Sequence, residues 1–298
     1  MALRLKIRFM LLSAVLLGWC GPGIAGEDIL TLKKGAMILS HTGQYGDEFP
    51  ANALIDGQVI PFWSSARRNV PGFRPDSFII ELARPYRIRR LVVENRENDE
   101  MYYPGISARK VRFSVSTVSS TGPWKPAAVI EGKKYDRSEV ELAEPVEARW
   151  LKVEVLSNHG HPLYTEISEL EAYGEPLTDE PLPKGNPGGI YRTNYGLLML
   201  KAEGEKVEGC YELDKGYVRG VTNGRVFEIE WFEHRGEERG TALLVLSSSG
   251  FLNGLWYEDG KMMGPWFGNR LPDRESIDCD PVTAAAGVGL STGTLADR

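Results

Sequence analysis

The sequence predicts an all-β protein of two domains, an antiparallel β-sandwich followed by a second small antiparallel β-meander or barrel. Two observations lead to this prediction. Short runs in which apolar and polar residues alternate recur between Gly, Pro and Asn turns, and no window of comparable length shows a convincing helical period. The length of 298 residues also suits about two domains at roughly 100 to 200 residues each.

Residues 1–25 are expected to form a cleaved signal peptide. Three basic residues within the first eight positions precede an apolar run at 9–19, and small residues follow up to Ala25. The run is shorter than the roughly 20 residues of a membrane span, so we expect no span after cleavage and a secreted or periplasmic protein. Cys20 suggests a lipoprotein as the alternative, which the bulky Trp19 before it disfavours.

The first domain contains five runs that are typical of strands, at 76–82, 88–96, 110–117, 138–144 and 148–156. In the third run Val111, Phe113 and Val115 point one way while polar residues between them point the other way. This period of two is typical of a half-buried strand. Several short strands separated by turns favour an antiparallel sandwich over a parallel sheet.

A Pro/Gly-rich segment at 176–189 has no hydrophobic period and is predicted to be a linker. Beyond it, residues 190–271 repeat a unit of apolar, x, Gly, x and an aromatic or apolar residue, as in Val207–Tyr211 and Leu252–Trp256. Repeated glycine in strands predicts close approach by a neighbouring strand's aromatic ring, or bends in a tightly coiled sheet. The polar, small-residue tail at 280–298 is predicted to be disordered.

The net charge bears on the class of binding partner, and the cysteine content bears on a possible disulfide. The formal net charge of −6 and the absence of a long Lys/Arg block argue against nucleic acid. Only Cys210 and Cys279 remain after signal cleavage. An oxidising compartment would allow them to pair, but the sequence leaves open whether they form a disulfide or stay free thiols.

Several consecutive blocks of the first domain resemble the discoidin family, also called the coagulation-factor type C domain, which includes the family 32 carbohydrate-binding modules. The blocks run from AMILSHTGQYGDEFPANALIDGQVIPFWSS to ISELEAYGE, and the resemblance covers 35–175. It implies an eight-stranded jelly-roll sandwich in which loops at one end bind a ligand. It also implies a structural calcium site nearby, as many members have.

The resemblance places that calcium site on two distant segments. The family's Asp-Gly turn falls on Asp56-Gly57, and the Glu before its last motif falls on Glu169. By analogy the carbonyls of Ala53 and Pro61 and an oxygen of Gln58 complete the shell, since calcium takes about six to eight oxygen ligands. Gln58 and Pro61 replace an acidic or Asn residue and a Thr of the family pattern, so a lower affinity is expected.

Asp56 also has a simpler interpretation, in which its carboxylate caps its own turn and Glu169 is a solvated charge at a strand edge. Trp63, which follows the turn, is expected to fill the end of the sandwich core rather than contact a ligand. The role of Trp150 stays open.

The resemblance assigns ligand binding to loops at 41–49, 66–74, 96–104 and 158–164. They carry aromatic rings that stack on a pyranose and polar groups that hydrogen-bond its hydroxyls. The residues expected to bind ligand are Arg96, Asn98, Tyr102, Tyr103 and His159. The alternative is solvated loop tips with incidental aromatic residues. His159 and His161 share a face, but only His41 could join them, so zinc is not predicted.

No nucleophile elbow, metalloprotease helix, phosphate loop or dinucleotide motif occurs, so an enzyme is not expected. The sequence therefore predicts a secreted, non-catalytic protein that binds a glycan or polysaccharide through its first domain, with calcium as a structural cofactor. The alternative is an envelope scaffold or adhesion protein, in which that domain binds a protein partner and the second domain mediates assembly.

Overall fold

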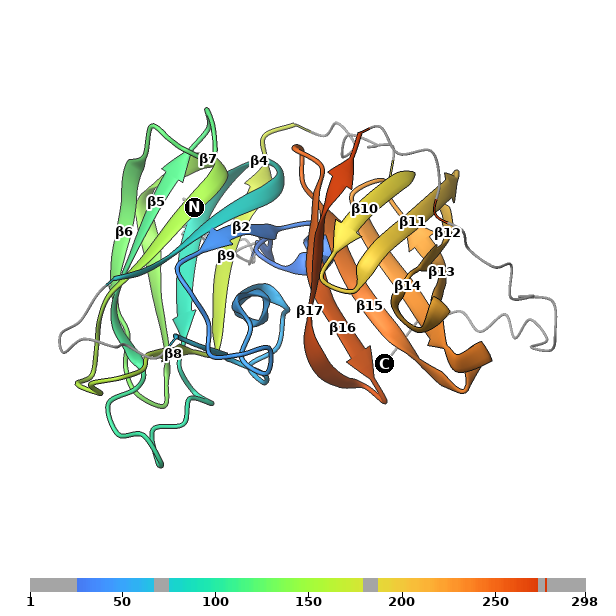
Figure 1. The fold of residues 1–298 in the computed structure, drawn as a ribbon. Helices are drawn as coiled ribbons and strands as arrows, with labels where there is room; N and C mark the ends of the chain where they lie inside the picture. Colours follow the sequence, from blue (N-terminus) through green and yellow to red (C-terminus); the bar gives the residue numbers. More distant parts are fainter. Residues whose placement is uncertain (1–25, 67–74, 179–186, 273–276, 278–298) are drawn as a thin grey trace, which may run out of the picture.

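The computed structural model describes residues 26–66, 75–178, 187–272 and 277, and shows two all-β domains in contact (Figure 1). The predicted all-β class is confirmed. The expected signal peptide and disordered tail lie outside the described residues, as does most of the expected linker. No helix within the described ranges has the length and apolar character needed to cross a membrane.

The first domain is a sandwich whose elements include two short 3-10 helices. In chain order these are β1 (Glu27–Asp28), η1 (Leu32–Lys34), β2 (Met37–His41), η2 (Ala51–Ile55), β3 (Trp63–Ser64), β4 (Asp76–Glu94), β5 (Ala108–Ser116), β6 (Lys125–Glu131), β7 (Arg137–Asn158), β8 (Glu166–Ile167) and β9 (Glu169–Pro176). The main sheet has the order β1-β9-β4-β7-β5-β6, β2 also pairs with β4, and β3 pairs with β8.

Two long strands connect the layers of the sandwich. The second half of β4 pairs with β9 and with the first half of β7. The first half of β4 pairs with β2 and with the second half of β7, which continues the sheet to β5. The sequence indicated separate strands at 76–82 and 88–96, and again at 138–144 and 148–156. The structure joins each pair into one strand, because pairing resumes after register shifts where the strand passes between layers.

The sandwich core encloses Trp63, as the sequence predicted. Trp63 is fully buried and packs edge-to-face on Phe78, with ring centroids 4.9 Å apart. Its indole N–H donates to the carbonyl of Gly43 at 3.1 Å. Burying a ring of this size contributes much of the stability at this end of the domain.

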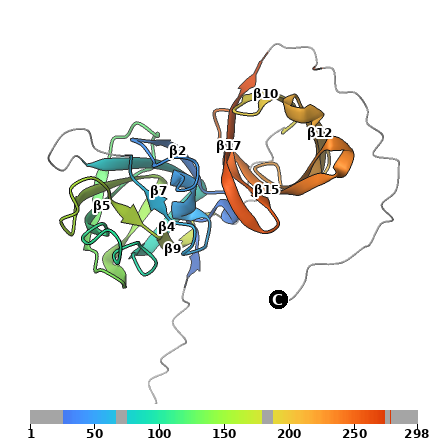
Figure 2. The ribbon, with the colours of Figure 1, turned by 60° about the horizontal axis from the view of Figure 1, so that its bottom comes forward.

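The second domain is a closed antiparallel barrel, seen nearly end-on in Figure 2. Its strands are β10 (Gly189–Thr193), β11 (Gly196–Glu203), β12 (Lys206–Tyr211), β13 (Tyr217–Thr222), β14 (Val226–Glu233), β15 (Glu238–Leu246), β16 (Phe251–Glu258) and β17 (Lys261–Leu271), with η3 (Leu213–Lys215) and η4 (His234–Gly236) in its turns. Pairing of β10 with β17 closes the ring. Cys210 forms a disulfide, and both other cysteines lie outside the described residues.

The repeated glycines of the barrel allow neighbouring backbones to approach closely. At four of the barrel glycines an added Cβ would lie about 2 Å from a carbonyl oxygen of a neighbouring strand: Gly209 at 2.0 Å from Met199, Gly220 at 2.1 Å from Glu228, Gly240 at 2.0 Å from Tyr257 and Gly254 at 2.0 Å from Leu243. The nearest neighbour at these positions is therefore backbone. Any side chain there would separate the strands. The aromatic ring that the sequence suggested is found at Gly216, where an added Cβ would lie 2.0 Å from the Tyr211 ring, and at Gly240, 2.7 Å from the Trp231 ring.

One hydrophobic cluster extends from the sandwich core into the interface between the domains, and the barrel interior forms a separate cluster. Val226, Val245 and Leu255 of the barrel belong to the same buried cluster as the sandwich core. Within this interface the side-chain amides of Asn52 and Asn253 bond to each other at 2.7 and 3.1 Å. Asn52 also donates to the carbonyl of Gly254, and Asn253 to that of Ile38. The amide pair therefore satisfies polar groups from both domains where water is excluded.

Candidate functional site

Three of the predicted ligand loops meet at one end of the sandwich, the end at which β8 is labelled in Figure 1. The backbone N–H groups of His159 and His161 donate to the carbonyls of Ser107 and Gly105 at 3.1 and 3.0 Å. The N–H of Tyr45 donates to the carbonyl of Ser64 at 2.8 Å, which fixes the loop at 41–49 to β3. The fourth loop, 66–74, lies almost wholly outside the described residues.

These loops form an aromatic cluster, which we define as Tyr45, Phe49, Tyr103, His161 and Tyr164. Tyr164 is its centre: its ring lies 5.4 Å from Tyr45, 6.4 Å from Tyr103 and 5.7 Å from His161, on which it is stacked. Tyr45 and Tyr103 are 47% and 44% exposed. The cluster therefore presents ring surface from three separate loops to solvent.

The loop that carries His161 and Tyr164 is fixed by Asn158. The Asn158 side-chain amide donates to the carbonyls of His161 and Tyr164 at 2.8 and 2.9 Å. The imidazole Nδ1 of His161 accepts from the N–H of Tyr164 at 3.0 Å. A neutral imidazole that accepts at Nδ1 carries its proton at Nε2, so His161 offers a hydrogen-bond donor beside the stacked rings.

The predicted ligand residues take different positions. Tyr103 lies in the aromatic cluster, and Tyr102 next to it is 74% exposed at the loop tip. His159 turns away from the cluster, because its Nε2 pairs with the carbonyl of Gly132 at 2.9 Å. His159 and His161 thus have separate partners and do not face a common point.

Arg96 and Asn98 are held by the scaffold. The Arg96 guanidinium pairs with the buried carboxylate of Glu94 at 2.6 Å, while half of its side chain stays exposed. Asn98 is 5% exposed, and its amide donates to the carbonyl of Glu166 at 3.0 Å and accepts from the Ser168 hydroxyl at 2.9 Å. Asn98 therefore ties the loop after β4 to β8.

Tyr45, Phe49 and Tyr164 were not singled out from the sequence, and His161 was considered there only as a zinc ligand. All four lie in loops that the resemblance had assigned to ligand binding. Aromatic residues within a predicted loop were a usable signal, but their convergence depends on how the loops fold together. That convergence has no counterpart in local sequence.

A second feature is the pair of carboxylates of Asp56 and Glu169. Asp56 ends η2, and the N–H of Gln58 donates to its Oδ1 at 2.8 Å. The N–H of Gly57, whose φ is +85°, donates to Glu169 Oε1 at 3.1 Å. Asp56 is thus the turn former of the simpler interpretation, and it also faces Glu169 from the other end of the domain.

Burial raises the pKa of Asp56 to about 7, and the hydrogen bonds from its own turn and with the Glu169 side chain oppose this increase only in part. Burial raises the pKa of Glu169 well above its usual value, and the neighbouring charge of Asp56 adds to the increase. One oxygen of each group, Asp56 Oδ2 and Glu169 Oε2, has no hydrogen-bond partner among the described residues. Two buried carboxylates with free oxygens fit a hard cation, which would neutralise both.

The other three residues assigned to the metal lie around the same turn. Ala53 is fully buried in η2, Gln58 is exposed, and Pro61 is half-buried after the turn. All three belong to the segment that carries Asp56, whereas Glu169 lies in β9. The segment 53–61 thus carries four of the five residues that the resemblance assigned to the metal, and β9 carries the fifth.

The barrel reaches this carboxylate pair through Tyr257. Burial raises the pKa of the Tyr257 phenol, and the charges of Asp56 and Glu169 add to the increase. Tyr257 also packs against the hydrophobic cluster that extends into the interface. The carboxylate pair therefore lies close to the interface of the two domains.

Comparison with known proteins bears on the first domain. The family model described as "F5/8 type C domain" matches residues 39–170. No curated protein matches the chain. Three similar solved structures are the family 32 carbohydrate-binding module of Streptococcus pneumoniae EndoD, the family 32 module of Clostridium perfringens NanJ in complex with galactose, and the C-terminal domain of a chitobiase from Bacteroides fragilis.

Their sequence identities to this chain are 20%, 18% and 20%, and their TM-scores are 0.40, 0.40 and 0.42. They cover 49%, 49% and 51% of this chain, and the matches span 99%, 97% and 100% of the other chains. The matched part of this chain is thus about half of it.

Proposed function

Since residues 39–170 form an F5/8 type C (discoidin) domain, we propose that the loop end of this domain binds carbohydrate. The observation that carries the proposal is the aromatic cluster, in which rings from three loops converge at the exposed end of the sandwich. A pyranose has an apolar face that packs on such rings and hydroxyls that need polar partners at its edge.

The chemistry of the cluster suits a sugar better than a charged ligand. Tyr103 and Tyr45 offer exposed ring faces, and His161 offers an N–H donor next to them. Tyr102 and Met101, 74% and 78% exposed, extend this surface along the same loop. Galactose is bound by the similar Clostridium perfringens module, which makes it a suitable first ligand to try.

We also propose a structural calcium ion between Asp56 and Glu169. These two carboxylates would hold it together with the backbone carbonyls of Ala53 and Pro61 and an oxygen of Gln58. The ion would supply charge compensation for the buried pair and would clamp the segment 53–61 to β9. The unpartnered oxygens of both carboxylates support this assignment.

The proposed protein acts by binding, outside the cytoplasm, with no catalytic step. Three basic residues and an apolar run at the N-terminus support secretion or a periplasmic location.

A glycan array probed with the mature protein in calcium tests the proposal. We expect selective binding to a set of related glycans, and release of the bound protein by the corresponding free sugar. Binding no stronger than background to every glycan on the array would contradict carbohydrate binding. The alternative, a protein partner in the envelope, predicts that the protein stays on its natural surface when free sugar is added.

A further inference from the structure

The barrel contains a cavity of about 120 Å³ at one end, apart from the aromatic cluster of the sandwich. Because the strands alternate in direction, the turns after β10, β12, β14 and β16 all lie at this end. Its lining consists of five aromatic residues, three glutamates and one leucine: Tyr195, Tyr211, Trp231, Trp256, Trp266, Glu233, Glu238, Glu258 and Leu213. The volume is enough for several water molecules or one small headgroup.

The five aromatic rings form a continuous chain of edge-to-face contacts. The centroid distances are 5.1 Å for Tyr211 and Trp266, 5.7 Å for Trp266 and Tyr195, 5.9 Å for Tyr195 and Trp256, and 5.5 Å for Trp256 and Trp231. Interplanar angles of 71° to 85° turn successive ring faces in different directions. A box of this kind surrounds a compact group with electron-rich faces, the arrangement that attracts cations.

The charged residues that line the cavity are all acidic, although His234, which is not among the lining residues, lies 3.7 Å from Glu238. Glu233, Glu238 and Glu258 line it, and the described residues in its lining include no Lys, Arg or His. Asp47 of the sandwich lies close by: besides burial, its charge and that of Glu233 raise the pKa of Tyr195. A neutral ligand gains nothing from this field, whereas a cation is drawn to it.

One polar group in the cavity has no partner. Trp266 is 3% exposed and lines the cavity, and its indole N–H has no hydrogen-bond partner among the described residues. The other two indoles are paired: Trp231 donates to the carbonyl of Tyr257 at 3.2 Å and Trp256 to the Tyr195 hydroxyl at 2.8 Å. A buried N–H without an acceptor is costly, so the ligand should bring an oxygen to it.

We propose that this cavity binds a small organic cation, a protonated or methylated ammonium group with a hydroxyl or carbonyl oxygen a few bonds away. The ammonium group lies among the aromatic rings, balanced by the glutamates. The adjacent oxygen accepts from the indole N–H of Trp266.

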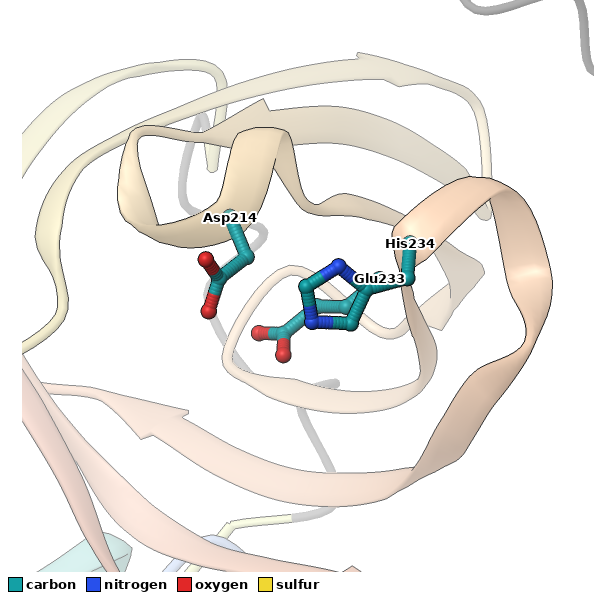
Figure 3. Close-up of side chains that lie close together, drawn as sticks. All are labelled: Asp214, Glu233 and His234. Carbon is teal, nitrogen blue, oxygen red and sulfur yellow. The ribbon is translucent and has the colours of Figure 1, made fainter.

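A metal ion is the other cation to weigh at this end of the barrel. Asp214, Glu233 and His234 point toward one another (Figure 3), and their ligand atoms lie within 4.8 Å. Asp214 and His234 are exposed, and Glu233 already accepts from the Tyr211 hydroxyl at 2.6 Å. We therefore assign no metal ion to these three residues.

Calorimetric titration of the full chain with choline, alongside its tryptophan fluorescence, tests the proposal. Choline combines a quaternary ammonium group with a nearby hydroxyl, and 3,3-dimethyl-1-butanol is its neutral isostere. We expect saturable binding of choline to one site, with a fluorescence change, and affinity about tenfold lower for the neutral isostere. Equal affinity for the two compounds, or no saturable binding of choline, would overturn the proposal.

Two variants locate the site. Glu258→Gln removes one cavity charge, and Trp266→Phe keeps an aromatic ring while removing the N–H; each should weaken choline binding severalfold. Glu230→Gln is the matched control, because Glu230 pairs with Arg219 on the exposed face of β14. Unchanged affinity in both cavity variants would overturn the proposal. So would choline binding that is abolished by EDTA and restored by zinc, which would assign the site to the Asp214 cluster.

Discussion

Arg225 of the barrel donates to Glu81 of the sandwich at 3.1 Å, and the two side chains are 7% and 1% exposed. Glu81 also accepts from Arg149 at 2.7 Å, so one carboxylate is shared by two guanidinium groups. Arg225 further donates to the carbonyl of Gly35 at 2.8 Å. The domains are therefore joined by a buried ionic network, in addition to the shared hydrophobic cluster.

The first prediction concerns this network. Arg225→Ala should lower the free energy of unfolding by about 3 to 5 kcal/mol, because it leaves Glu81 buried with one partner fewer. It should also separate the unfolding of barrel and sandwich into two calorimetric transitions where the wild type shows one. Arg219→Ala removes an exposed ion pair with Glu230 and should cost at most about 1 kcal/mol. A single transition in Arg225→Ala, with a midpoint like that of Arg219→Ala, would contradict a structural role.

The second prediction is a link between calcium and pH. The folded-state pKa of Asp56 is raised from 3.8 to about 7. Between these values the metal-free folded protein holds a proton that the unfolded chain has released, so its stability falls as the pH rises from about 4 to 7. The proposed calcium ion would replace that proton. Its stabilising effect should therefore be larger at pH 8 than at pH 5, and should raise the melting temperature by several degrees at saturation.

Thermal melts with added calcium or chelator at the two pH values measure this effect. Asp56→Asn is the matched variant, because it keeps an oxygen acceptor for the turn and removes the titrating charge. It should abolish both the calcium effect and the part of the pH dependence assigned to Asp56. If calcium stabilised Asp56→Asn as much as the wild type, the ion would not be bound at Asp56.

The third prediction distinguishes residues that stabilise the loop after β4 from residues of that loop that are free to contact a ligand. Asn98→Ala removes a buried amide with several partners and should cost about 1 to 3 kcal/mol of stability. Tyr102→Ala, at an exposed tip, should leave the melting temperature nearly unchanged. Denaturant unfolding of the two variants measures the difference. Equal stability of the two would show that Asn98 does not tie the loop to β8.

The sequence allowed us to predict the roles of residues that follow from the local strand and turn pattern. It did not allow us to predict roles that depend on how distant segments pack together. Trp63 follows a turn and begins a strand, which was enough to place it in the core. The prediction that Asp56 and Glu169 face each other came from the family resemblance, since no local sequence pattern connects positions so far apart. Asn98 looked like a ligand residue because it is polar and in a loop, but its amide is used by the scaffold.

The interface between the domains had no sequence signal. Asn52 and Arg225 are polar residues of a kind usually found at the surface, yet both are buried against the other domain. The Pro/Gly segment suggested independent domains, and only the packed structure shows the hydrophobic cluster that they share. Closure of the barrel likewise depends on the pairing of its first and last strands, which alternation within each strand does not determine.

The central claim, carbohydrate binding at the aromatic cluster, is tested most directly by titrating one array-selected glycan into the wild type and Tyr164→Ala in calcium. Tyr164 touches three other rings, so its loss should weaken binding about five- to thirtyfold, equivalent to about 1 to 2 kcal/mol. Phe267→Ala, an exposed aromatic of the barrel, is the control and should bind as the wild type does. Wild-type affinity in Tyr164→Ala, with the fold intact, would contradict the claim.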